Sequence, residues 1–129
     1  MEANKLKHLE FIQGIINRMA HNSFIIKGWL LTIVTALIAI SMERGIYDLI
    51  SVIYIPIIIF WFLDAYFLRQ ERLFRHLYDK VRMQTEKEID FSMKTNSKEE
   101  CYLAVLFSIT LRWFYIPIIL ITTSIYFLI

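Results

Sequence analysis

Three long apolar blocks, at residues 23–42, 46–68 and 102–129, alternate with polar segments along the chain. Each block approaches or exceeds the roughly 17–25 residues that a membrane-spanning helix needs. The middle block alone would give roughly 35 Å of helix against an apolar bilayer core of roughly 30 Å. The pattern therefore predicts an all-α integral membrane protein with three transmembrane helices.

The polar sequence after the second block contains no Gly or Pro before Arg82. Nothing local should end the helix at the membrane surface, so we expect it to continue into water. Residues 69–100 would then form a cytoplasmic helical extension and loop within a transmembrane domain that covers residues 23–129. Asn96 or Ser97 can cap a last helix of about thirty residues.

The N-terminal segment, residues 1–22, has the periodicity of an amphipathic cytoplasmic helix. Its apolar positions recur at helical spacing: Leu9, Ile12, Ile16 and Met19. This helix could lie among lipid headgroups or pack on the extension of the second span. Its modest basicity favours packing on protein. Asn22 and Ser23 are suited to cap the next helix, so we expect a helix boundary there.

Hydrophobic residues make up 57% of the chain and aromatic residues 16%, which is unlike an ordinary soluble domain. The turn at residues 43–45 holds one basic residue, whereas residues 69–100 hold eight Lys and Arg. The positive-inside rule therefore predicts a multi-pass protein of the cell inner (plasma) membrane. The N-terminus and residues 69–100 would be cytoplasmic and the C-terminus outside. A cleaved signal peptide is disfavoured, because the preceding segment is long and has its own helical periodicity.

Asp64 and Arg112 are charged residues inside the apolar blocks, near the expected cytoplasmic boundary. Asp64 lies on the second span and Arg112 on the third, at similar depth on antiparallel helices. Ionisable groups in a span are costly and often mark function, so the two side chains could form an intramembrane pair. Alternatively, Arg112 extends to the interface beside Trp113 and Asp64 reaches water unaided.

Small residues recur at spacings of three and four along the first span. In lipid, small side chains let helices approach closely. The stripe therefore predicts a helix-packing surface within or between subunits, made by Gly28, Thr32, Thr35, Ala36 and Ala39.

The helical extension of the second span carries most of the candidate ligand-binding residues. Two explanations compete: juxtamembrane bases anchor a protein to anionic lipid, or copies around a symmetry axis line a vestibule for phosphate or single-stranded nucleic acid. The excess of Arg over Lys favours phosphate contacts somewhat. The candidate residues are Arg69, Arg72, Arg75, His76, Lys80 and Arg82.

Recognisable catalytic motifs are absent from the sequence: it has no Gly-rich phosphate loop, zinc-binding His-Glu motif or Ser-centred nucleophile elbow. We therefore expect a protein that is not an enzyme, with no cofactor and no metal site.

Residues 5–29 and 60–72 resemble the small membrane effectors of bacterial antiphage defence operons of the Hailong type. The resemblance implies a homo-oligomeric ion-channel-like effector, with a tetramer as the expected assembly. It also implies a short single-stranded DNA ligand, made by a partner nucleotidyltransferase, that holds the channel shut. Loss of the ligand would open the channel and stop growth. The resemblance assigns no individual binding residue.

Together these observations predict a membrane effector that is gated by a polyanionic signal, short single-stranded DNA or a nucleotide, at a cytoplasmic basic surface. The alternative is a structural or scaffolding membrane subunit that recruits a soluble partner. In that case the basic helix would only anchor the protein to anionic membrane lipid.

Overall fold

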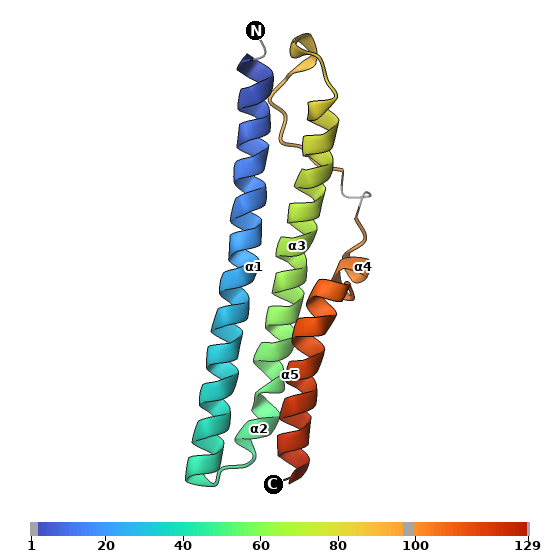
Figure 1. Ribbon diagram of the computed structural model, residues 1–129. Helices are drawn as coiled ribbons and strands as arrows, with labels where there is room; N and C mark the ends of the chain where they lie inside the picture. The colour runs from blue at the N-terminus through green and yellow to red at the C-terminus, as the bar shows by residue number, and fades with distance from the viewer. Residues whose placement is uncertain (1–2, 97–99, 129) are drawn as a thin grey trace.

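Two long antiparallel helices, α1 and α3, dominate the computed structural model, which describes residues 3–96 and 100–128. They lie side by side along nearly their whole length, and α5 runs beside the half of α3 nearer the α1–α2 turn (Figure 1). The described residues contain no strand, which confirms the all-α prediction. The helices are α1 (Ala3–Arg44), α2 (Leu49–Val52), α3 (Tyr54–Arg82), the short 3₁₀ helix η1 (Glu86–Glu88), α4 (Tyr102–Leu106) and α5 (Ile109–Leu128).

Among the described residues, three helical stretches are long and apolar enough to cross a bilayer: Ala3–Arg44, Leu49–Arg82 and Ile109–Leu128. This number agrees with the three apolar blocks of the sequence. Large apolar side chains cover their outer surfaces; Phe24 is 74% exposed, Trp113 76% and Phe127 79%. Continuous apolar surface of this kind is unfavourable in water and suits contact with lipid.

The prediction of a helix boundary at Asn22 and Ser23 is wrong, because α1 continues through both residues. No proline interrupts the segment, so the backbone hydrogen bonds can run on uninterrupted. Ser23 is buried and bonds to Asp64 of α3 instead of capping a helix. The N-terminal amphipathic segment and the first apolar block therefore form one rod of 42 residues.

The second span, expected as one helix over residues 46–68, is divided at Ile53 into α2 and α3. Pro56 lies in the first turn of α3, where no helical partner is needed for the N–H that proline lacks. In a helix that continued from α2, the same proline would lie in the interior and would break the helix. Beyond that point the prediction is confirmed: α3 runs unbroken to Arg82.

The third span is also not continuous, since α4 ends at Leu106 and α5 begins at Ile109. The Trp61 indole N–H donates to the Leu106 carbonyl oxygen at 2.8 Å. In an unbroken helix that carbonyl would accept the amide of residue 110. At the break, the hydrogen bond from Trp61 therefore replaces the helical hydrogen bond that the Leu106 carbonyl would otherwise accept.

Two apolar clusters hold the rods together. One joins the apolar blocks and includes Leu30, Ile57 and Leu111, each fully buried. The other lies between the polar ends of α1 and α3, where Ile12 and Ile16 pack with Val81. The N-terminal segment thus packs on α3, as its modest basicity favoured. Complete burial of one such Ile side chain stabilises by roughly 1.5–3 kcal/mol.

The connection after α3 closes over the start of α1. Its Glu86 carboxylate accepts the backbone N–H groups of Asn4 and Lys5, each at 3.1 Å. The first amides of a helix lack partners within the helix, and an acid there also meets the positive end of the helix dipole. Glu86 therefore caps α1 from a position far away in sequence.

Candidate functional site

A buried polar cluster joins the three long helices where the apolar and polar parts of the rods meet. We call it the Asp64 cluster; it comprises Asp64 of α3, Ser23 and Lys27 of α1, and Tyr115 of α5. Lys27 Nζ donates to Asp64 Oδ2 at 2.5 Å and to Ser23 Oγ at 2.7 Å. The Ser23 hydroxyl donates to the other carboxylate oxygen, and the Tyr115 hydroxyl donates to Asp64 Oδ2 at 2.8 Å.

Asp64 is fully buried, whereas the Lys27 side chain is 20% exposed. A buried carboxylate is tolerated only when donors and a counter-charge replace water, and here three donors surround it. The Tyr115 ring is fixed by stacking on Trp61, with ring centroids 5.7 Å apart. The cluster therefore holds α5 to the α1–α3 pair with a defined geometry.

The predicted pair of Asp64 with Arg112 is not formed, because Lys27 occupies the place of the counter-charge. Arg112 is exposed on the outer side of α5, and no carboxylate in residues 3–96 and 100–128 pairs with it. The sequence did carry a signal for the correct partner. Lys27 is the basic residue within the first apolar block, and Ser23 lies one helical turn before it.

Beyond this cluster, the polar ends of α1 and α3 project as the hairpin extension, residues 3–21 and 69–82. Several of its predicted ligand-binding bases already have acidic partners. Arg75 pairs with Glu71 at 2.8 Å, and Arg82 lies 3.9 Å from Asp79.

The segment before α4 occupies another part of the basic face of α3. His76 Nε2 lies 2.9 Å from Glu100 Oε1, and Arg69 Nε donates to the Glu100 carbonyl oxygen at 3.2 Å. Within the described chain, Arg72 and Lys80 are the two predicted bases without an ion pair or hydrogen bond. The predicted basic surface is therefore narrower than the sequence pattern indicated.

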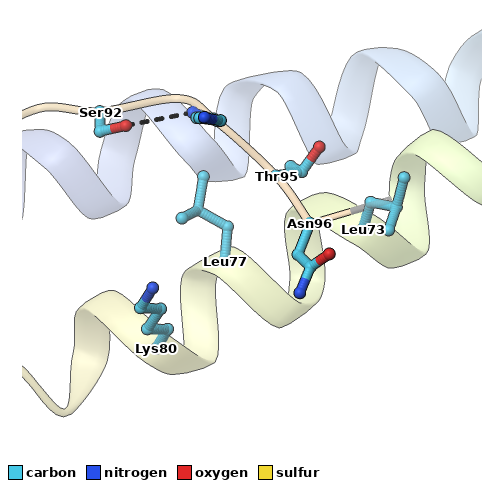
Figure 2. A pocket seen from close by; sticks show the side chains of 7 residues that line it. Leu73, Leu77, Lys80, Ser92, Thr95 and Asn96 are labelled. Atoms are coloured by element: carbon cyan, nitrogen blue, oxygen red, sulfur yellow. Dashed lines mark hydrogen bonds between the residues drawn. The ribbon is translucent and has the colours of Figure 1, made fainter. Parts of the chain in front are cut away.

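Lys80 lies at the edge of a groove of about 420 Å³ between α3 and the connection. Figure 2 shows Leu73 and Leu77 beneath the backbone that carries Ser92, Thr95 and Asn96, with Lys80 beside them on α3. Lys94 also lines the groove. The arrangement places two ammonium groups and several neutral polar groups around an apolar floor.

His8 fixes the same connection to α1. Its ring is completely buried, and Nε2 lies 2.8 Å from the Ser92 carbonyl oxygen. The ring also packs on Phe91, whose φ of 55° is unusual for a bulky residue. No local sequence pattern indicates this contact, because Ser92 is 84 positions away from His8.

The small-residue stripe does not pack within the subunit, since Gly28, Thr32, Thr35, Ala36 and Ala39 are all exposed on α1. A Cβ placed on Gly28 would meet nothing within 4 Å. Packing within one subunit is therefore excluded for this surface, and packing between subunits stays a prediction.

In residues 3–96 and 100–128, no group of His, Cys, Asp or Glu side chains is arranged to hold a metal ion. No protein family, curated protein or solved structure matches the chain.

Proposed function

We propose that the protein is a homo-oligomeric, ion-channel-like membrane effector whose hairpin extension binds a polyanionic signal and transmits it to the spans. The observation that carries this proposal is the continuity of α1 and α3. Each helix runs without a break from the apolar region into the polar extension, and the two pack on each other. A force on one end of such a pair reaches the other end without an intervening flexible joint.

The dimensions support a sensor that stands clear of the membrane. A helix of 42 residues is about 63 Å long, and a bilayer core takes roughly 30 Å of it. Arg82 lies 14 residues beyond Leu68, which corresponds to about 21 Å along the helix axis. Electrostatic attraction to a lipid surface decays over roughly 8–10 Å at ordinary ionic strength. The far end of α3 is thus better placed for a soluble ligand than for lipid headgroups.

The Asp64 cluster supports coupling between the sensor and all three spans. It lies at the base of the hairpin extension and bonds α1, α3 and α5 to one carboxylate. A small shift between α1 and α3 there would change the bonds that hold α5. Packed polar networks of this type have discrete arrangements, as a gate requires.

Binding of the signal is assigned to the side of α3 that carries Arg72 and Lys80, next to the groove. These bases have no acidic partner in the described part of the chain, so their donors are available to phosphate. Short single-stranded DNA, which the antiphage resemblance implies, or a nucleotide would supply that phosphate. The other bases contribute mainly to the structure of the extension.

Conduction would require several subunits, because three spans do not enclose an aqueous path. A tetramer is the expected assembly from the antiphage resemblance. The exposed small-residue stripe on α1 is the surface we assign to contacts between subunits.

A scaffolding role is the second candidate, and one observation favours it. Glu71, Asp79 and Glu100 neutralise part of the basic face, which lowers its attraction for a polyanion. A scaffold would recruit a soluble protein through the hairpin extension and would show no ion flux.

Binding of a fluorescent single-stranded oligonucleotide to the purified protein, measured across salt concentrations, tests the assignment. The double variant Arg72→Gln/Lys80→Gln should weaken binding and reduce the log–log salt slope by roughly 1 per lost phosphate contact. The matched control Arg75→Gln/Arg82→Gln removes two bases that already have acidic partners and should change the slope less.

Ion flux from proteoliposomes supplies the functional readout, with and without the oligonucleotide. Ion flux that the oligonucleotide suppresses in the wild type, but no longer suppresses in the first double variant, would support the effector. Absence of both binding and flux in the wild type would favour the scaffold.

A further inference from the structure

The outer side of α5 carries a groove that none of the functions above uses. It has a volume of about 330 Å³ and is lined by Arg112, Trp113, Ile116, Pro117 and Leu120. We propose that this groove binds an anionic phospholipid, with the phosphate on Arg112 and an acyl chain along the apolar residues.

The charge distribution within the groove supports a lipid rather than a soluble anion. Among the described residues that line it, Arg112 is the one cation, and the side chains that follow toward the C-terminus are apolar. A free phosphate would use the guanidinium but would gain nothing from Ile116 and Leu120. A phospholipid has a phosphate followed by an acyl chain, which matches the order of Arg112 and the apolar side chains along the helix. Burial of the acyl chain excludes water from the apolar side chains of the groove.

The position of Arg112 along α5 also fits a headgroup. It lies one helical turn before Tyr115, whose hydroxyl bonds to Asp64 at the base of the hairpin extension. The guanidinium is therefore near the boundary where the helices leave the apolar region. Trp113, exposed to 76%, is the residue type that concentrates at this depth of a membrane.

Arg112 also has no protein partner in the part of the chain that the structure describes. No carboxylate among residues 3–96 and 100–128 pairs with it, and Asp64 is already engaged by Lys27. An unpaired arginine within an apolar helix is costly, and its charge must be met by water or by an anion. A phosphodiester accepts two parallel guanidinium hydrogen bonds, so an anionic lipid meets the charge with good geometry. Lipid retention here would thus be specific to headgroup charge.

Pro117 contributes the shape of the groove. It lies inside α5 and leaves the carbonyl one turn earlier without its helical amide partner. Its ring is part of the apolar wall between Arg112 and Leu120.

The test is binding of phosphatidylglycerol and phosphatidylcholine with the same acyl chains to the full-length protein in detergent, counted by native mass spectrometry. The wild type should retain phosphatidylglycerol with an affinity roughly fivefold higher than phosphatidylcholine. Arg112→Gln should abolish this preference, and Arg112→Lys should keep part of it. The matched control Arg44→Gln, at the opposite end of the rods, should retain it.

Two further arms separate the sources of the phosphate and exclude misfolding. Glycerol phosphate and inorganic phosphate, added at millimolar concentration, should not displace the retained lipid. Unchanged helical content in Arg112→Gln would show that the loss of lipid preference is a local effect. Leu120→Gln tests the apolar wall that contacts the acyl chain, and it should lower retention of both lipids. Equal binding of the two lipids by the wild type, undiminished preference in Arg112→Gln, or displacement by the free phosphates would overturn the proposal.

Discussion

Replacement of Lys27 by methionine tests whether the Asp64 cluster stabilises the fold as its geometry indicates. The variant keeps the length and apolar character of the stem but removes the charge that lies 2.5 Å from Asp64 Oδ2. Asp64 is 0% exposed and would be left with neutral donors alone. Removing one partner of a buried ion pair costs about 3–5 kcal/mol, and partial exposure of Lys27 places our estimate near 3 kcal/mol.

The reverse change should cost less. In Asp64→Leu, Lys27 loses its partner, but its flexible stem can carry the ammonium group to water. We expect a loss of about 1–2 kcal/mol for this variant. The double variant Lys27→Met/Asp64→Leu removes both charges and should cost about 1–2 kcal/mol, well below the sum of the two single losses. This residual loss remains because the Ser23 and Tyr115 hydroxyls also lose their carboxylate acceptor.

Reversible unfolding of the purified protein in mixed micelles, titrated with dodecyl sulfate, measures all three variants. The control is Lys7→Met, which breaks the exposed pair with Glu10 and should change stability by less than about 0.5 kcal/mol. If Lys27→Met were as stable as this control, or if the effects of the two cluster substitutions simply added, the coupling that we assign to the pair would not exist.

Three further predictions concern other parts of the molecule. Gly28→Leu should leave the helix content of the subunit unchanged, because no other side chain lies near Gly28 within the subunit. The same change should shift the assembly toward monomers in light scattering. An unchanged assembly would show that the small-residue stripe is not part of the interface between subunits. Glu86→Ala should cost about 1 kcal/mol and speed amide exchange at the start of α1, because two helix-end amides lose their acceptor; exchange there that matches the wild type would contradict the cap. Hydrogen bonds from the Thr85 amide and hydroxyl lower the pKa of Glu88 below its ordinary value of 4.5, so the stability they give is present above that pH and is lost as the pH falls through the lowered pKa. Thr85→Ala should therefore raise the Glu88 pKa part of the way back in a carbon-detected NMR titration, and a further fall would refute the assignment.

Local sequence determined the features that depend on regular periodicity. The continuation of α3 from Leu68 to Arg82 followed from the absence of Gly and Pro in that stretch. The spacing of Ile12 and Ile16 indicated an apolar face, and that face packs against α3. Both are properties of a single helix and its nearest neighbour in space.

The errors arose where a distant residue competed with a local preference. Ser23 was expected to cap a helix, but a buried carboxylate 41 positions away takes its hydroxyl. The third span was expected to be continuous, but the Trp61 indole bonds to the Leu106 carbonyl at the break. The wrong counter-charge was assigned to Asp64 because the sequence indicates the depth of a residue along its helix but not the direction in which its side chain points. Depth restricts which residues can meet, and rotation about the helix axis decides between them. Lys27 and Arg112 have similar depth, and only Lys27 faces α3.

The central claim is that α3, paired with α1, continues as a rigid helix from the membrane into the polar extension. Spin labels placed singly at successive positions from 62 to 78 in lipid nanodiscs measure this directly, through label mobility and accessibility to oxygen and to a water-soluble relaxation agent. We predict accessibility that varies with a period of 3.6 residues and keeps its phase through Leu68 and Arg72, while the favoured reagent changes from oxygen to the water-soluble agent. Loss of the period with high label mobility between these two residues would show a flexible joint and would contradict the account.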